Sequence, residues 1–228
     1  MNHKIHSPKT AQDLFPNRFV FNDKLKKWIP GGLEVTIIEG VSTIIGGGTP
    51  STKIEEYYCK NGIAWLSPKD LSNYGWRYIE KGRVDITRLG LQKSSAKLMP
   101  KGTILFSSRA PIGYMAIAEN EICTNQGFKS LVPNKSILTE YLFQFLKFNT
   151  EQIKNIATGS TFAEISSTML KNILIIKPPT KILGYLELKV KLINNQNLLN
   201  QKQTQVLIKL RDTLLPKLIS FLITIMNF

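Results

Sequence analysis

The sequence predicts an α+β fold in which a mixed α/β domain is followed by a long C-terminal helix. Short apolar runs separated by glycine and proline turns fill residues 33–179, a pattern typical of strands in a globular domain. Beyond Pro179 the composition changes, because from Thr180 to Leu215 there is no proline and no glycine after Gly184. The 228 residues suit one large domain, or one domain with an extension.

We expect four segments along the chain. Residues 1–32 are expected to form a linker or N-terminal arm that ends at a Pro-Gly-Gly sequence. Residues 33–179 form the globular domain, and residues 180–220 form the long helix. Residues 221–228 are an apolar tail that is too short to cross a bilayer.

Within the globular domain, β-branched and apolar runs bounded by turn residues predict the strands. The expected strands are residues 33–45, 63–66, 103–107, 114–118, 130–132 and 173–176. The first strand stops at the glycine turn (residues 46–50, Gly-Gly-Gly-Thr-Pro), which only glycine-rich backbone could make. Apolar residues at helical spacing predict a helix over residues 138–150, with Thr139 as its cap and Lys147 near its end.

The long helix carries a seven-residue repeat. The repeat consists of Tyr185, Leu192, Leu199 and Val206, with Leu188, Gln196, Gln203 and Leu210 near the alternate positions. This spacing predicts a coiled-coil seam on a helix about 45–50 Å long. We expect Leu192, Leu199, Val206 and Leu210 to contact a partner helix. The alternative is a helix that packs on its own domain. Pro216 is expected to end or kink the helix.

The composition argues against several classes of protein. With 43% hydrophobic and 20% charged residues, the chain is expected to be globular rather than disordered. Two cysteines (Cys59, Cys123) and two histidines (His3, His6) make a disulfide scaffold or a zinc site improbable, so we expect no metal. No signal peptide opens the sequence, and no apolar run reaches the ~18 residues of a membrane span. We therefore expect a cytoplasmic protein that does not bind membranes.

The positive charge favours a polyanionic partner. The formal net charge is +14 and the sequence pI is about 9.8. Residues 53–109 hold eleven basic and five acidic side chains, and residues 180–228 hold seven and two. Nucleic acid is the commonest partner of such a protein. Trp65, Tyr74, Trp76 and Tyr78 could lie against sugars or bases, although they could equally belong to the core.

No motif predicts catalysis. The segment from Gly46 to Lys53 lacks the spacing of a phosphate-binding loop, because no glycine precedes Lys53 and Ile54 follows it. Residues 177–180 share only their prolines with the Asn-Pro-Pro-aromatic signature of amino-methyltransferases, and there is no Gly-x-Ser-x-Gly elbow. A nuclease that uses Asp70 and Glu80 with Mg²⁺ remains open as an alternative.

Four blocks rich in small polar, amide and basic side chains lie beside the expected turns. They are residues 65–70, 106–113, 123–129 and 158–166. Arg and Lys can pair with guanine, Asn and Gln can pair with adenine, and Ser or Thr can reach bases or phosphates. The same residues are also ordinary turn formers. In so basic a chain, we expect at least one block to face DNA.

In this order, and followed by a leucine-rich helix, the blocks resemble the specificity subunit of type I restriction–modification systems. The segments that carry the resemblance are Gly-Gly-Thr-Pro-Ser (47–51), residues 65–70, Ser-Ser-Arg-Ala-Pro-Ile-Gly (107–113), Thr-Asn-Gln-Gly-Phe-Lys (124–129) and Gly-Ser-Thr-Phe (159–162). Residues 211–220 look like the end of that family's C-terminal helix. The resemblance covers nearly the whole chain from about Asp13 onward.

The resemblance implies a DNA-reading adaptor without catalysis. Such a subunit usually has two target-recognition domains, each reading half of a bipartite double-stranded site, and two antiparallel helices that set their separation. This chain holds one such domain and one helix, so it looks like a half-subunit that pairs with itself or with another half. The expected partners are modification subunits, which carry S-adenosylmethionine, and a restriction motor subunit, which carries ATP and Mg²⁺. No cofactor is expected in this chain. The apolar tail departs from the family's usual end.

We expect a defined set of side chains to contact DNA. They are Lys69, Arg77, Lys97, Arg109, Asn125, Gln126, Lys129 and Thr161, with Arg109, Asn125 and Gln126 at base edges and the lysines at phosphates. The alternative in a different class is a non-catalytic basic scaffold that binds nucleic acid nonspecifically. It would show a steep salt dependence with a specificity ratio near one.

Overall fold

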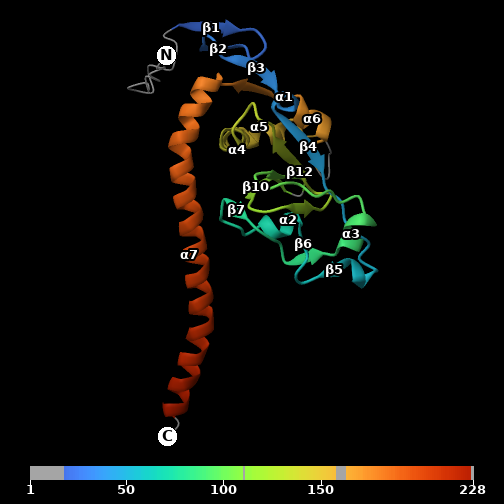
Figure 1. The fold of residues 1–228 in the computed structure, drawn as a ribbon, viewed down its shortest axis with the longest axis vertical. Coiled ribbons are helices and arrows are strands. Elements are labelled where there is room, and N and C mark those ends of the chain that lie inside the picture. Colours follow the sequence, from blue (N-terminus) through green and yellow to red (C-terminus); the bar gives the residue numbers. More distant parts are fainter. Residues whose placement is uncertain (1–17, 110, 158–162, 227–228) are drawn as a thin grey trace, which may run out of the picture. The chain divides into compact units, whose positions relative to one another are not determined.

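The computed structural model describes residues 18–109, 111–157 and 163–226. The chain divides into two compact units, residues 1–187 and 188–228, and each is considered by itself. The described strands and short helices lie in the first unit, and one long helix continues into the second (Figure 1). The predicted α+β class is therefore confirmed, with a mixed domain followed by a long C-terminal helix.

A β-hairpin occupies part of the segment expected to be a linker or arm. Strands β1 (Phe19–Asn22) and β2 (Lys27–Pro30) pair antiparallel. In the turn, Asn22 Oδ1 accepts hydrogen bonds from the backbone N–H groups of Lys24 (3.1 Å) and Leu25 (3.0 Å), while Lys26 adopts a φ of 52°. The hairpin is missed in the sequence because a lysine, rather than glycine or asparagine, takes the left-handed position.

The expected single strand over residues 33–45 is wrong, because one helical turn interrupts it. Strand β3 (Glu34–Ile37) pairs with β13 (Leu174–Lys177), and strand β4 (Ser42–Gly46) pairs with β12 (Lys129–Pro133). Between them lies α1 (Ile38–Val41), whose Ile38 and Val41 side chains are fully buried. The turn lets one apolar run serve two different sheets.

Two mixed sheets form the body of the first unit. The five-stranded sheet has the order β4-β12-β9-β10-β7, where β9 is Ile104–Ser108, β10 is Ile112–Ala118 and β7 is Tyr78–Ile79. The four-stranded sheet has the order β11-β6-β8-β5, where β11 is Ile122–Thr124, β6 is Ile63–Leu66, β8 is Val84–Ile86 and β5 is Tyr58–Cys59. Parallel pairs β10–β7 and β11–β6 sit among antiparallel neighbours. The strands predicted around residues 63–66, 103–107, 114–118, 130–132 and 173–176 are confirmed within one or two residues.

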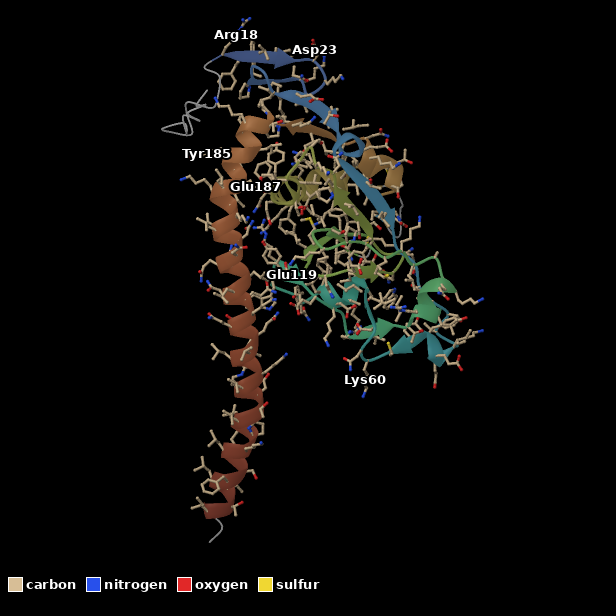
Figure 2. All side chains as sticks on the ribbon, viewed as in Figure 1. Arg18, Asp23, Lys60, Glu119, Tyr185 and Glu187 are labelled. Carbon is tan, nitrogen blue, oxygen red and sulfur yellow. The ribbon has the colours of Figure 1, made fainter. Side chains whose placement is uncertain are left out.

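One hydrophobic core joins the two sheets. Ala64 and Leu66 of β6 pack with Leu105 of β9, Ala116 of β10 and Phe128, and each is at most 5% exposed. All five residues of β9 are buried, as expected of a central strand. Side chains fill the space between these elements, while Lys60, in the turn between β5 and β6, is exposed (Figure 2). The sheets therefore provide a rigid support for the turns at their ends.

Short helices cover the sheets. Helix α4 (Thr139–Phe148) and α5 (Thr150–Asn155) pack against β10, and α6 (Ser167–Lys171) packs against β4. The remaining short helices are the 3₁₀ helix η2 (Glu55–Tyr57), α2 (Pro68–Leu71) and α3 (Arg88–Gln92). The predicted helix over residues 138–150 is confirmed, but Thr139 is not its cap, since Leu138 occupies the N-cap position and Thr139 Oγ1 points to Gly102 O, at 3.5 Å.

Helix α7 (Thr180–Met226) runs through Pro216 without ending there. Proline costs the helix one backbone hydrogen bond, and the surrounding Leu, Ile and Lys residues are good helix formers. The tail expected from residue 221 onward therefore begins as helix, up to Met226. At its start, Ile182 and Leu183 are buried in the first unit, which anchors the helix to the domain. No helix in the described ranges is long and apolar enough to cross a membrane.

The central position of β9 predicts a large cost for truncating its core side chain. We expect Phe106→Ala, at a fully buried position, to lower the free energy of unfolding by about 3–5 kcal/mol, through lost burial and the cavity left behind. Urea unfolding measures this. The control is Leu98→Ala at a 40% exposed position, expected to cost below about 1 kcal/mol. Equal costs at the two positions would contradict the assignment of the core.

Candidate nucleic-acid interface

The glycine turn passes between two other stretches of backbone. A Cβ atom on Gly47 would overlap the carbonyl oxygens of Thr124 and Asn125, and one on Gly48 would overlap Ser95 and Ala96. Gly48 donates its N–H to Thr124 O at 2.8 Å. Glycine is therefore required here by close approach of backbone, as only a residue without Cβ fits.

Two aromatic side chains fix the other side of this turn. Trp65 Nε1 donates to Gly48 O at 2.9 Å, and Tyr58 Oη donates to Pro50 O at 2.6 Å. The two rings form an edge-to-face pair with centroids 6.1 Å apart. Burial raises the pKa of Tyr58. Trp65 therefore belongs to the core of the turn, which favours the structural alternative for this aromatic residue.

Residues 125–127 form the next turn and connect three elements. Asn125 donates its N–H to Leu66 O at 2.8 Å, and its Oδ1 accepts from Gly127 N at 2.9 Å. Gln126 is exposed and its Oε1 accepts a hydrogen bond from Thr49 Oγ1. Gly127 lies so close to Pro68 that a Cβ atom would stand 2.8 Å from Pro68 Cγ. This turn joins the glycine turn to helix α2.

Helix α2 begins with a capping box. Ser67 N and Ser67 Oγ donate to Asp70 Oδ2 at 2.8 and 2.7 Å, and Pro68 holds the first helical position. Arg83 Nε and its backbone N–H donate to Asp70 Oδ1 at 3.0 and 3.2 Å. Burial by itself would raise the pKa of Asp70, but the hydrogen bonds from Ser67 and Arg83 outweigh it and lower the pKa. Lys69, on the same turn, is exposed.

The alternative of a nuclease with Asp70 as a metal ligand gains no support. Both carboxylate oxygens of Asp70 are engaged by protein donors. In the part of the chain that the structure describes, no three His, Cys, Asp or Glu residues form a group that could hold a metal ion. Cys123 is buried, which raises the pKa of its thiol to about 11.

The end of β9 carries a pair of cations that share one carboxylate. Glu164 lies 3.8 Å from Arg109 Nη1 and 3.2 Å from Lys129 Nζ. The Arg109 side chain is 40% exposed, whereas that of Lys129 is 16% exposed. The cluster keeps one positive charge in excess, and Arg109 is the cation that solvent and a ligand can reach.

The two serines before Arg109 are structural. Ser107 Oγ donates to Pro111 O and accepts from Tyr114 N, each at 2.8 Å. Ser108 donates its N–H to Gly127 O at 2.8 Å and is fully buried. These bonds attach the end of β9 to Pro111, to Tyr114 and to the turn at residues 125–127. A bulge between Ile112 and Met115 follows, where Gly113 adopts a φ of 100°.

These contacts bring four sequence blocks together into one surface, which we call the loop cluster (residues 47–50, 67–70, 107–109 and 125–129). Its exposed or half-exposed polar side chains include Thr49, Lys69, Arg109, Asn125 and Gln126. They offer two cations, two amides and a hydroxyl, the groups that recognise base edges and phosphates. Most bonds between the blocks involve backbone atoms.

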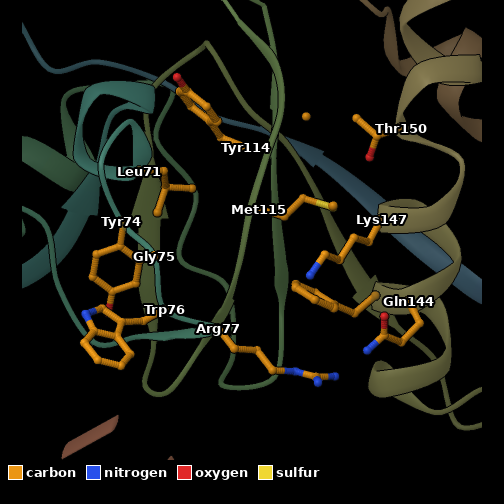
Figure 3. Close-up of a pocket in the computed structure, with 12 residues that line it drawn as sticks. Leu71, Tyr74, Gly75, Trp76, Arg77, Tyr114, Met115, Gln144, Lys147 and Thr150 are labelled. Atoms are coloured by element: carbon orange, nitrogen blue, oxygen red, sulfur yellow. The ribbon is translucent and has the colours of Figure 1, made fainter. Parts of the chain in front are cut away.

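Among the described residues, two of the expected DNA contacts, Arg77 and Lys97, lie outside the loop cluster. Arg77 forms an ion pair with Glu140, and its guanidinium lies 4.8 Å from the Phe143 ring centroid. The guanidinium is therefore engaged by side chains of helix α4 rather than directed at a ligand. With Trp76, Gln144 and Lys147 it lines a pocket of about 340 Å³ (Figure 3). Lys97 is exposed and follows Ala96, which backs the glycine turn. Thr161 lies outside the described residues.

The other aromatic residues of the basic stretch are also tied into the fold. Tyr78 is buried, and burial together with the charge of Glu140 raises its pKa. Tyr74 Oη donates to Tyr78 O at 2.5 Å, and Trp76 is half-buried beside Arg77. These contacts therefore give no support to stacking on DNA bases by Tyr78. The same holds for Trp65, whose indole N–H is bonded to Gly48 O.

Comparison with known proteins gives the family. A family model described as the type I restriction modification DNA specificity domain matches residues 15–211. The chain belongs to this family.

Curated relatives are longer specificity subunits of type I restriction enzymes. The MjaIX subunit of Methanocaldococcus jannaschii is 42% identical over 188 residues, covering 80% of this chain and 42% of that protein. The HindI subunit of Haemophilus influenzae is 27% identical over 195 residues, covering 84% of this chain and 42% of that protein. This chain therefore spans about two-fifths of the length of these relatives.

Solved structures share the fold. The HsdS subunit from Thermoanaerobacter tengcongensis superimposes with a TM-score of 0.57 at 20% identity, over 84% of this chain and 43% of that one. A chain from a study of complex assembly in the type I R-M system gives 0.59 at 21% identity, over 84% and 44%. A mixed domain followed by a long helix is therefore an architecture shared with these structures.

Two polar residues that contribute to the candidate site, Thr49 and Glu164, could not be identified from the sequence alone. Thr49 bonds to Gln126, and Glu164 pairs with both Arg109 and Lys129. Both residues lie in quoted blocks, but pairs 35 to 77 positions apart leave no local signal in one sequence. The only local signal is that Glu164 is the single carboxylate in the block of residues 158–166, which otherwise consists of small polar and apolar residues.

The close approach at the glycine turn predicts a position-specific cost. We expect Gly47→Ala to lower the free energy of unfolding by about 2 kcal/mol or more, since its Cβ would overlap two carbonyl oxygens. Gly46→Ala is the matched control, as nothing lies within 4 Å of a Cβ there. Thermal or urea unfolding measures both. A Gly47→Ala protein as stable as Gly46→Ala would rule out the close packing of this turn.

The lowered pKa of Asp70 predicts acid sensitivity. A carboxylate whose folded pKa lies below the ordinary value of 3.8 stabilises the fold above that pH, and the contribution is lost as pH falls through the folded pKa. We expect wild type to exceed Asp70→Asn in stability by about 1–2 kcal/mol at pH 7, because charged hydrogen bonds are lost. The gap should narrow as the pH falls below 3.8 in urea titrations. A gap that stays constant with pH would refute this role of the charge.

Proposed function

We propose that this chain reads one half of a bipartite double-stranded DNA target as a half-length specificity subunit of a type I restriction–modification complex. Family membership and the loop cluster support this proposal together. The cluster presents reachable cationic, amide and hydroxyl side chains on turns whose backbone is fixed by hydrogen bonds. That rigid display of side chains is the observation that carries the proposal, because base reading requires groups held in fixed positions.

Within the loop cluster, Arg109, Asn125 and Gln126 are assigned to base edges. Arg109 retains donors beyond its contact with Glu164 and is half-exposed. Asn125 uses Oδ1 for Gly127, so its Nδ2 amide remains for an acceptor on the DNA. Gln126 is exposed at the tip of its turn. Because arginine pairs with guanine and amides pair with adenine, the assignment predicts base-specific losses on truncation.

Phosphate contacts are assigned to lysines. Lys69 and Lys97 are exposed; Lys69 follows Pro68, whose ring packs on Gly127, and Lys97 follows Ala96, whose backbone packs on the glycine turn. Lys129 is mostly buried and pairs with Glu164, so its role is to position Arg109 rather than to reach phosphate directly. Arg77 is assigned to packing, and Thr161 remains an expected contact.

Helix α7 is assigned to subunit pairing. Leu192, Leu199, Val206 and Leu210 are 50–75% exposed along its length. Covering such a stripe with a second helix is the usual solution for apolar residues at this spacing. Two copies that pair antiparallel through α7 would place one recognition domain at each end, which restores two readers from a half-length chain. Another half-subunit could take the second copy's place.

Methylation and cleavage are assigned to partner subunits in the cytoplasm. A modification subunit would supply S-adenosylmethionine, and a motor subunit would supply ATP with Mg²⁺. This chain would contribute recognition and docking. A nonspecific basic scaffold is the competing function, and the DNA experiment below separates the two.

We expect Arg109→Ala to lose discrimination at one base pair of the target. The protein would be assembled with its modification subunits, and the target would first be found by mapping methylated sites in the host genome. Binding to the target and to its single-base variants should show a loss of about 1–3 kcal/mol confined to one position. Lys60→Ala is the control, as it removes an exposed cation outside the loop cluster. Unchanged discrimination in Arg109→Ala would exclude base reading by this residue.

Lys69→Ala should behave differently from Arg109→Ala. Loss of a phosphate contact weakens binding to all duplexes alike, and it lowers the slope of log K against log salt by about one. Titrations at several salt concentrations, with target and random duplexes, measure both quantities. A wild-type protein that binds all duplexes equally would favour the nonspecific scaffold instead.

A further inference from the structure

An apolar groove of about 540 Å³ lies in the first unit between hairpin β1–β2, helices α4 and α5, and strand β13. Its apolar walls include Leu25, Tyr141, Phe145, Phe148, Ile156 and Ile176. Lys24 and Lys27 line it from the hairpin, and its described lining residues include no carboxylate. The groove is distinct from the loop cluster, with which it shares no residue.

The groove exposes large apolar side chains. Phe148, the last residue of α4, is 89% exposed, and Ile156 is 46% exposed. Single exposed apolar residues are common, but a large aromatic ring beside an apolar groove is typical of a binding surface. These residues have no part in the loop cluster. A partner that covered the groove would remove their apolar surface from water.

The groove lies at the N-terminal end of α7. Ile176 belongs to β13, and α7 begins at Thr180. Tyr141 Oη donates to Ile176 O at 2.6 Å, which holds α4 against β13. The buried Ile182 and Leu183 anchor the first turn of α7 in the same unit. The relation between the groove and the start of the helix is therefore fixed within the first unit.

The far end of α7 is apolar over more than half of its circumference, with its polar side chains (Lys217, Ser220 and Thr224) on one face. In residues 214–225, the apolar side chains are Leu214, Leu215, Leu218, Ile219, Phe221, Leu222, Ile223 and Ile225, each 48–63% exposed. Successive residues of a helix point about 100° apart, so Phe221, Leu222 and Ile223 face three different directions. One partner helix covers a single stripe about 100° wide, whereas the apolar surface of this end is wider than that. This end therefore needs a second surface besides a partner helix.

We propose that the apolar end of α7 (residues 214–225) of one copy occupies the groove of a second copy. The inference rests on the antiparallel helix pair of the proposed function. The 47 residues of α7 span about 70 Å, and exposed apolar residues run from Leu188 to Ile225. Overlap along the full length covers both ends of that stripe. It brings residues 214–225 of each copy to the start of the other copy's helix, where the groove lies.

Charge and orientation agree with this occupant. Residues 214–225 contain one charged side chain, Lys217, which lies on the polar face with Ser220 and Thr224, and the apolar face that would enter the groove carries no charge. The C-terminal end of a helix carries partial negative charge on its free carbonyl groups, and Lys24 and Lys27 line the groove. In a parallel pair, by contrast, each apolar end would contact only the same end of the other copy. The rest of its apolar surface would stay exposed to water.

Disulfide trapping tests the contact in the full-length chain. In a Cys59→Ser background, one tagged chain carries Phe148→Cys and a differently tagged chain carries Leu222→Cys. We expect the mixture to give a covalent dimer with both tags under mild oxidation. The matched control pairs Leu222→Cys with Leu98→Cys, an apolar position of 40% exposure outside the groove, and should give none. Self-linking of Leu222→Cys, without the mixed dimer, would show parallel ends and overturn the proposal.

A second variant measures the contribution of the groove without a cross-link. We expect Phe148→Ser to raise the dimer Kd about tenfold or more, because burial of the Phe148 ring is lost in both grooves of the dimer. The ring is 89% exposed, so the monomer should stay folded by circular dichroism. Leu98→Ser is the control and should leave Kd unchanged. An unchanged Kd in Phe148→Ser would also overturn the proposal.

Different results would contradict the occupied groove and the proposed function. A dimer that discriminates its DNA target, but neither forms the mixed disulfide nor responds to Phe148→Ser, contradicts only the occupied groove. A chain that is monomeric alone and with modification subunits, and that binds all duplexes equally, contradicts the proposed function as well.

Discussion

The loop cluster depends on the close approach of backbone segments at the glycine turn. Gly47 and Gly48 leave no space for a Cβ atom, so the turn lies directly against residues 124–125 on one side and 95–96 on the other. Trp65 and Tyr58 hold the turn from the core through hydrogen bonds to its carbonyl groups. Sequence blocks far apart in the chain thereby meet at one place, and this meeting turns several weak local patterns into a single surface.

Much of the fold could be predicted because its signals are local. The central strands are short apolar runs bounded by turns, and α4 and α7 have helical periodicity over many residues. The hairpin and the interruption at α1 could not be predicted in this way. In the hairpin, Lys26 takes a conformation usually given to glycine, and at α1 an unbroken apolar run changes sheets. Tertiary packing, rather than local preference, decides both.

The candidate site was predictable in composition but not in detail. Basic and amide residues beside turns indicate DNA contact, and the structure brings Lys69, Arg109, Asn125 and Gln126 into one cluster. The same pattern cannot show that Arg77 pairs with Glu140, or that one carboxylate, Glu164, neutralises part of the charge of two cations. Such pairs join distant positions, so a list of residue types overestimates how many cations remain for DNA.

The bonds that join the blocks use mainly backbone atoms. Gly48 donates to Thr124, Asn125 donates to Leu66, and Ser108 donates to Gly127, all through N–H groups to carbonyl oxygens. Replacing the exposed side chains at positions 69, 109 and 126 would leave these main-chain hydrogen bonds intact. A scaffold of this type can acquire a new target by changing a few side chains, with little penalty in folding. If the chain reads DNA as proposed, rapid diversification of its target is thus compatible with an unchanged architecture.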